Sequence, residues 1–138
     1  MFRDAFKRHR CIIILASGYY EWITKADGKQ PFFISAVDGG ALSFAGLWDR
    51  WKNPKTVEIV TSCTIIVTDA NAFTRPIHDR MPVILDRTDF KAWLNGAAGA
   101  ELLRPAADEC VRVWPVSRRV NKTGNGDDDP SLADEVVA

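Results

Sequence analysis

The sequence contains little of what marks a disulfide-rich or metal-dependent protein. Its 138 residues include three cysteines and two histidines. Cys11, Cys63 and Cys110 are odd in number and widely spaced, which predicts no disulfide framework. Cys11 and Cys63 lie in apolar runs, so we expect them to be buried free thiols. His9 and His78 have no ligand-like spacing, and we therefore predict no metal site and no cofactor.

Long hydrophobic runs are also absent. No apolar stretch approaches the ~18 residues that a membrane span needs, and the first residues carry charge without the apolar core of a secretory signal. Lys plus Arg and Asp plus Glu both total 18, so the formal net charge is zero. Any attraction to DNA must therefore come from a local patch. We expect a cytoplasmic monomer with no membrane partner.

The charges are nevertheless unevenly distributed along the chain. Two solvated ends would explain this pattern, and so would a basic segment beside a phosphate-binding groove with an acidic tail held away from it. Basic residues gather at the start and acidic residues at the end: Arg3, Lys7, Arg8 and Arg10 against Asp127, Asp128, Asp129, Asp134 and Glu135.

Short β-branched and aromatic runs separated by Gly, Asp and Pro predict a chain made mainly of strands. Asp27-Gly28 predicts a hairpin turn. The fold class is therefore α+β, mainly antiparallel β, with a curled or barrel-like sheet and a few short helices. We expect one domain over residues 1–120 and a flexible acidic tail over 121–138. Strands are expected at 10–16, 19–24, 31–36, 42–48, 57–68 and 111–116, and helices near 1–9, 88–95 and 100–104.

A carboxylate lies in the middle of an aromatic strand at Glu21. Strand periodicity places Tyr19, Glu21 and Ile23 on one face and Tyr20 and Trp22 on the other. If the first face points inward, burial raises the pKa of Glu21 and suits it to acid–base chemistry near neutral pH. A solvated outward face is the alternative, and the pattern alone leaves both open.

A loop bounded by Pro76 and Pro82 holds three polar residues in succession. His78 can exchange protons near neutral pH, and Arg80 offers a fork of donors to a phosphate. Asp79 could orient either neighbour. A surface turn with a histidine of no function is the alternative, although a proline-rigidified loop favours placed side chains.

Taken in order, several segments resemble the SRAP (SOS-response-associated peptidase) family. The resemblance covers nearly the whole chain, and the motifs occur in the family's order. They are Phe2-Arg3-Asp4-Ala5-Phe6 with Arg10-Cys11, Ala16-Ser17-Gly18-Tyr19-Tyr20-Glu21-Trp22, Phe44-Ala45-Gly46-Leu47-Trp48-Asp49, Pro76-Ile77-His78-Asp79-Arg80-Met81-Pro82 and Asp129-Pro130-Ser131-Leu132.

The resemblance implies an abasic-site processing enzyme of the lyase and autoproteolytic peptidase class, acting on single-stranded DNA in the SOS response to DNA damage. Glu21 matches the family's proton-shuttling catalytic Glu, and His78 matches the catalytic His that helps to open the sugar. Arg80 matches an Arg that holds a DNA phosphate. Trp22 is expected to offer a face to a base beside the lesion, and Arg3 belongs to the basic group expected to contact DNA.

The sequence departs from the family at its start. In the family, an N-terminal Cys exposed by removal of the initiator Met closes a thiazolidine ring on the abasic sugar, making a covalent protein–DNA crosslink. Residue two here is Phe2, so we expect a partial domain whose absent part, with the catalytic Cys, would supply strands to the same sheet. The alternatives are a non-catalytic remnant that binds single-stranded DNA, and a generic peptidase, which would need a nucleophile near His78.

Overall fold

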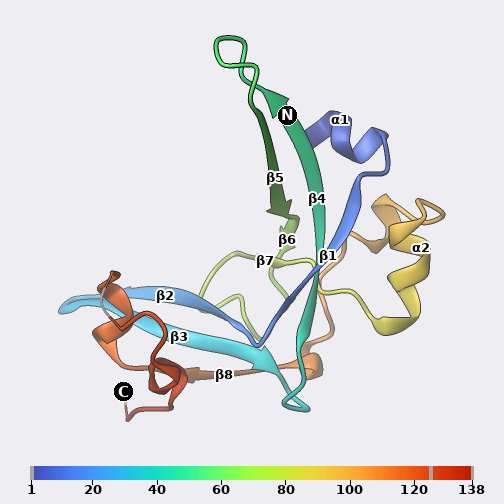
Figure 1. Ribbon diagram of the computed structural model, residues 1–138. Coiled ribbons are helices and arrows are strands. Elements are labelled where there is room, and N and C mark those ends of the chain that lie inside the picture. Colours follow the sequence, from blue (N-terminus) through green and yellow to red (C-terminus); the bar gives the residue numbers. More distant parts are fainter. Residues whose placement is uncertain (1, 125, 138) are drawn as a thin grey trace.

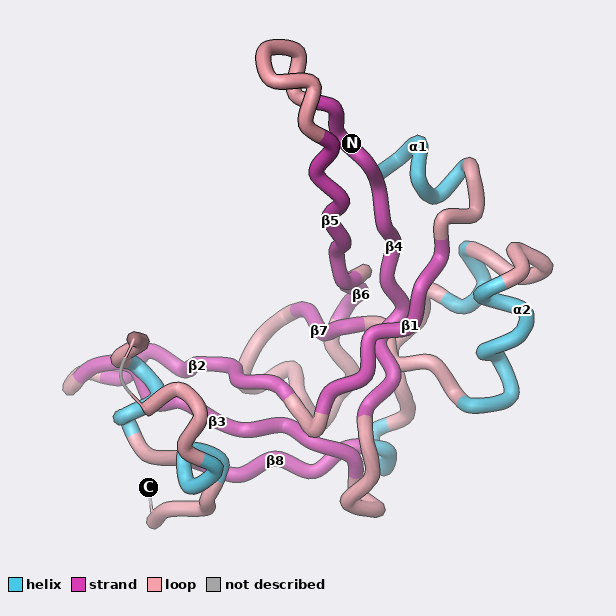
Figure 2. Tube along the Cα trace, viewed as in Figure 1, coloured by secondary structure: helices cyan, strands magenta, loops and turns pink. Residues whose placement is uncertain are grey.

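The fold consists mainly of short antiparallel strands with few helices (Figures 1 and 2). The computed structural model describes residues 2–124 and 126–137. In chain order its helices and strands are α1 (Phe2–Lys7), β1 (Cys11–Ala16), β2 (Tyr19–Lys25), β3 (Gly28–Ala36), β4 (Leu42–Lys52), β5 (Ile59–Ile65), β6 (Val67–Asp69), β7 (Arg80–Pro82), α2 (Phe90–Leu94) and β8 (Val111–Pro115). Short 3₁₀ helices cover Arg87–Asp89, Ala100–Leu102, Asp108–Cys110, Arg118–Asn121 and Pro130–Ala133.

The strands form three small antiparallel sheets. Their orders are β1-β4-β5, β2-β3-β8 and β6-β7. In Figure 1 the first sheet stands upright, the second lies across its lower end, and the β6-β7 pair lies between them. The predicted α+β class with mainly antiparallel strands is confirmed. The sheets do not close into a barrel among the described residues, so the barrel-like part of the prediction is not seen.

Local chemistry explains where the strands begin and break. The β2–β3 hairpin turns where Asp27-Gly28 predicted it, with Lys25 opposite Gly28 and a Gly28 φ of 124°, a value that favours glycine. The long strand expected over 57–68 is interrupted at Ile66. Its amide donates to the Ala45 carbonyl at 2.9 Å, which ends β5 and lets β6 pair with β7 instead.

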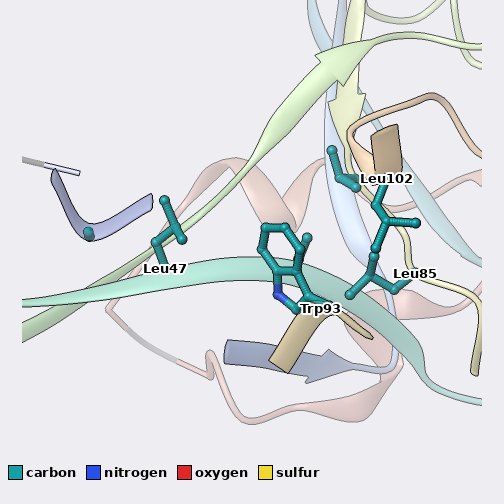
Figure 3. Packing of buried hydrophobic residues seen from close by; sticks show 7 residues of the cluster. Leu47, Leu85, Trp93 and Leu102 are labelled. Carbon is teal, nitrogen blue, oxygen red and sulfur yellow. The ribbon is translucent and has the colours of Figure 1, made fainter. Parts of the chain in front are cut away.

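Trp93 is the centre of the larger buried cluster. Its side chain has no exposed surface, and its indole N–H donates to the Ile12 carbonyl at 2.9 Å. Figure 3 shows the ring among Leu47, Leu85 and Leu102. The ring therefore joins α2 to the β1-β4-β5 sheet. A second cluster lies where the two larger sheets meet: Ile34, Ala36, Leu42, Phe44 and Val111.

Gly18 permits a close approach between the β1–β2 turn and β3. A Cβ at this position would lie 2.4 Å from the Phe33 ring and 2.5 Å from the Ile34 carbonyl oxygen. No larger residue fits there without moving backbone. Glycine at this point therefore sets how tightly β2, which carries Glu21, lies against β3.

The described part of the segment after residue 120, for which composition predicts a flexible acidic tail, makes contacts with the rest of the fold. The Trp114 indole N–H donates to the Ala133 carbonyl at 2.7 Å, and the Val136 amide donates to the Pro115 carbonyl at 3.0 Å. Arg119 pairs with Asp129 at 3.0 Å. The first two contacts join the segment to β8, and one of its acidic side chains, Asp129, has a basic partner.

Two further sequence expectations concern exposure. Cys63 lies exposed on β5, so the prediction that it is buried is wrong, whereas Cys11 is half-buried and burial raises the pKa of its thiol. Cys63 is exposed because β5 has β4 on one side and, among the described residues, no strand on its other side. Within that same part of the chain, no helix is long and apolar enough to cross a membrane.

The free edge of the β1-β4-β5 sheet, formed by β5, is apolar, and we expect it to drive self-association. Ile59 is 58 % exposed and Val60 44 %, on a strand with an unpaired row of backbone groups. Val60→Lys is expected to reduce association, because a charge on an edge strand opposes pairing between chains. Sedimentation velocity over a concentration series measures it. Val37→Lys, at an exposed position outside β5, is the matched control and should leave association unchanged. Equal association in all three proteins would contradict a role for the edge.

Candidate functional site

Glu21 is half-buried in the middle of β2, which favours the inward-facing alternative over a fully solvated one. Burial raises the pKa of its carboxyl, while the charge of His78 and the backbone amide of Trp22 lower it by less. The net effect is a carboxyl that keeps its proton to a higher pH than an ordinary glutamic acid. A group that can both hold and release a proton closer to neutrality suits acid–base chemistry.

The loop that carries His78 is fixed by buried polar residues. Asn71 Oδ1 accepts from the Thr74 amide at 2.9 Å and from the Thr74 hydroxyl at 2.8 Å, and Asn71 Nδ2 donates to the Ala106 carbonyl at 3.0 Å. The Thr74 carbonyl in turn accepts from the Ile77 and His78 amides. The sequence interpretation credited the prolines alone and missed Asn71. Its signal was an Asn at the start of a turn, where its side chain can bond the backbone.

The His78 ring is held through one nitrogen only. Nδ1 lies 3.1 Å from both the backbone N and the carbonyl O of Arg80, and 3.4 Å from an Asp79 carboxylate oxygen. If the Arg80 N–H donates to Nδ1, the neutral ring carries its proton on Nε2. Among the described residues Nε2 makes no hydrogen bond. This nitrogen is therefore available to exchange a proton with a bound molecule.

Arg80 follows His78 by two residues, at the start of β7. It is exposed, and its guanidinium forms no ion pair with any residue that the structure describes. Such a group can offer its donors to a phosphate oxygen. The backbone of Arg80 holds the His78 ring, while the side chain of Arg80 is exposed. One short segment therefore presents an imidazole and a guanidinium side by side.

Two other predicted DNA contacts lie apart from Glu21. Trp22 is on the opposite face of β2, where its indole N–H donates to Asn121 Oδ1 at 2.8 Å. Asn121, which sequence reasoning missed, also bonds the Lys29 carbonyl. Arg3 is exposed on α1, which packs on β4 far from β2 (Figure 1). Glu21 therefore lies within electrostatic range of His78, which is two residues before Arg80, whereas Trp22 is on the other face of β2 and Arg3 is on α1.

Glu21 and His78 do not line the better-defined hollows that the described residues form. Residues 2–124 and 126–137 contain no group of three or more His, Cys, Asp or Glu side chains arranged to hold a metal ion. What these residues offer is a carboxyl with a raised pKa, an imidazole and a guanidinium.

The raised pKa of Glu21 predicts how stability depends on pH. The carboxyl binds its proton more tightly in the folded than in the unfolded chain, so its contribution is complete below the unfolded pKa of about 4.5 and is lost as pH rises through the folded pKa. Glu21→Gln should therefore be more stable than the parent at pH 7, with the difference vanishing near pH 4. Chemical denaturation at both pH values measures this. A variant less stable at pH 7 would show that the ionised carboxylate stabilises the fold.

Comparisons with known proteins show which family and fold this chain resembles. Residues 1–123 match the family described as SOS response associated peptidase (SRAP). The abasic site processing protein YoaM of Bacillus subtilis is 37% identical over 131 residues, covering 90% of this chain and 56% of that protein. The abasic site processing protein HMCES of Gallus gallus is 35% identical over 143 residues, covering 86% and 42%. A crystal structure of a Bacteroides thetaiotaomicron protein superposes with a TM-score of 0.86 at 29% identity, covering 99% of this chain and 60% of that one.

In each comparison the matched region is a larger share of this chain than of its relative. The chain spans about half the length of the curated relatives it matches, while nearly all of the chain finds a counterpart in them. The shared region contains β2, the His78 loop and the sheets that support them. The geometry described above therefore belongs to a fold that longer proteins also possess.

Proposed function

Because this chain belongs to the SOS response associated peptidase (SRAP) family, whose matched relatives are named abasic site processing proteins, we propose that it binds single-stranded DNA at abasic sites and performs acid–base chemistry there. Glu21 and His78 exchange protons with the abasic sugar. Arg80 holds a neighbouring phosphate. Trp22 offers a face to a base beside the lesion, and Arg3 contacts the strand.

The observation that carries the proposal is the pairing of Glu21 with His78. The two come from segments more than fifty residues apart in the chain, yet the charge of His78 acts on the Glu21 carboxyl. An abasic deoxyribose opens to an aldehyde, and opening needs a proton delivered to the ring oxygen. A carboxyl whose pKa burial raises and an imidazole with an available Nε2 supply a pair of groups that can donate and accept protons.

The same pair supports a lyase step. In the open-chain sugar the hydrogen on C2′ is acidic because the carbon lies next to the aldehyde. A base that removes this proton forms the C2′–C3′ double bond and expels the 3′ phosphate, which breaks the strand. Glu21 or His78 acts as that base, and the Arg80 guanidinium stabilises the departing phosphate.

The crosslinking step needs a different group. A thiazolidine forms when the amine and the thiol of one N-terminal cysteine both add to the aldehyde. Cys11, Cys63 and Cys110 are internal and carry no free α-amine. We therefore assign the crosslink to an N-terminal Cys where a family member has one, and expect these 138 residues to bind and cleave without forming a thiazolidine.

Binding and cleavage can be tested on one oligonucleotide pair. We expect tighter binding to a single strand with one abasic site than to the intact strand, with affinity falling as salt rises. Arg80→Ala should weaken binding about threefold to tenfold, because it removes one charge-assisted phosphate contact. Fluorescence anisotropy measures both. Arg87→Ala, an exposed arginine near α2, is the control. Equal loss in both variants, or binding independent of salt, would contradict the assignment of Arg80.

A non-catalytic DNA-binding role is the second candidate, favoured by the internal position of all three cysteines. It predicts binding without strand cleavage on a denaturing gel. A generic peptidase finds no support, because no Ser, Thr or Cys side chain of the described residues hydrogen-bonds to His78.

A further inference from the structure

Tyr19 has a buried hydroxyl without a hydrogen-bond partner. Its oxygen is closed off from solvent and meets no donor or acceptor among the described residues. The ring packs edge-on against Phe44 at 5.9 Å and lies against the second buried cluster. The hydroxyl is therefore fixed in place by packing of the ring rather than by any bond of its own.

Such a hydroxyl destabilises the free protein. A buried polar group without a partner loses its bonds to water and gains nothing in return, so it calls for an explanation in a native structure. Phenylalanine would fill the same space against Phe44 without that penalty. The tyrosine oxygen therefore needs a partner that the described residues, in the arrangement seen, do not supply.

The neighbouring acceptor is Glu21, which lies two residues along β2 on the same face as Tyr19. Burial, and to a lesser extent the charge of Glu21, raise the pKa of the Tyr19 phenol well above its ordinary value. Tyr20 provides a contrast on the opposite face, where it contacts Phe33 and Trp22. Glu21 is half-buried, so a change of rotamer can bring its carboxylate to a donor that cannot itself move.

We propose that the Tyr19 hydroxyl positions Glu21 by donating a hydrogen bond to its carboxylate when DNA covers the site. This inference rests on the proposed function. In the free protein, water solvates the exposed part of the Glu21 carboxylate. A bound strand removes that water, and the fixed phenol then becomes the adjacent donor. The bond holds the carboxylate in one orientation and counters the rise in its pKa that further desolvation causes.

The test compares Tyr19→Phe with Tyr20→Phe, each of which removes one phenolic oxygen. Carboxyl-labelled glutamate reports the Glu21 pKa by NMR in the free protein and with a single-stranded oligonucleotide that carries a tetrahydrofuran abasic analogue. We expect Tyr19→Phe to leave the free pKa unchanged and to raise the pKa in the complex by about one unit, because a bond to the charged form is lost. Tyr20→Phe should change neither.

Thermal unfolding of the free proteins supplies the second readout. Tyr19→Phe should melt at the same temperature as the parent or higher, because it removes an unpaired buried group. A lower melting temperature would show that the hydroxyl is already bonded in the free protein, to a buried water or otherwise, and would overturn the proposal. An unchanged Glu21 pKa in a complex that does form would also overturn it. If the parent does not bind the oligonucleotide at all, the proposed function fails and the positioning role fails with it.

Discussion

Replacing Trp93 by alanine is expected to destabilise the chain by about 3–5 kcal/mol, the usual range for removal of a fully buried large aromatic. The side chain has no exposed surface, lies among the leucines of Figure 3, and contacts Phe6 with ring centroids 6.4 Å apart. Its loss would leave a cavity between α2 and the sheet. It would also leave the Ile12 carbonyl without its indole donor. Because domains are stable by only about 5–15 kcal/mol, this single change could unfold a large fraction of the protein.

Two further variants separate the causes of that loss. Trp93→Phe keeps much of the volume but lacks the N–H, so an intermediate loss is expected. Trp51→Ala removes the same side chain where it is 45 % exposed, on the distal part of β4, and should change stability by well under 1 kcal/mol. Urea denaturation gives all three values. A Trp93→Ala protein as stable as Trp51→Ala would mean that the cluster around Trp93 does not support the fold.

Glu21→Gln is expected to slow cleavage of abasic single-stranded DNA by about 10²–10⁴-fold, the range for loss of a general acid–base group. Glutamine keeps the size of the side chain and cannot exchange a proton. His78→Ala should have an effect of similar size. The double variant should cleave only slightly more slowly than the slower of the two single variants. Residues that act together in one step lose their joint contribution as soon as either is removed. Single-turnover cleavage followed on a denaturing gel measures each rate.

Stability distinguishes this result from simple unfolding. Glu21→Gln is expected to be more stable than the parent at pH 7, so a slower reaction cannot be attributed to lost structure. Glu58→Gln is the matched control, because it makes the same chemical change at an exposed position between β4 and β5, outside the candidate site. A Glu21→Gln protein that cleaves at the parent's rate would remove the carboxyl from the chemistry.

The sequence predicted the strands well because their patterns are local. The runs at 10–16 and 19–24 and the Asp27-Gly28 turn appear where side-chain alternation and turn chemistry placed them. The break at Ile66 could not be predicted in the same way. It depends on a hydrogen bond to Ala45, a residue some twenty positions earlier whose proximity only the assembled sheet creates.

The candidate site shows the same division. Alternation along β2 predicted that Glu21 and Tyr19 share a face, and the proline-bounded loop marked His78 and Arg80. Sequence spacing could not reveal that Trp22 is bound by Asn121, because the two residues are 99 positions apart in the chain. The Asn71–Thr74 contact is local, and the Asn at the start of the turn was a signal that the sequence interpretation did not use.

The contacts of the segment that follows β8 determine where the chain can be shortened or fused to another protein. Arg118 reaches Asp27 at the tip of the β2–β3 hairpin at 2.9 Å, and Asn121 bonds both strands of that hairpin. Ending the chain at Val120, or fusing a reporter there, would remove the Asn121 contacts and loosen the hairpin that carries Glu21. An affinity handle or fluorescent label is therefore better attached in the exposed turn near Lys55, at the distal end of β4 and β5.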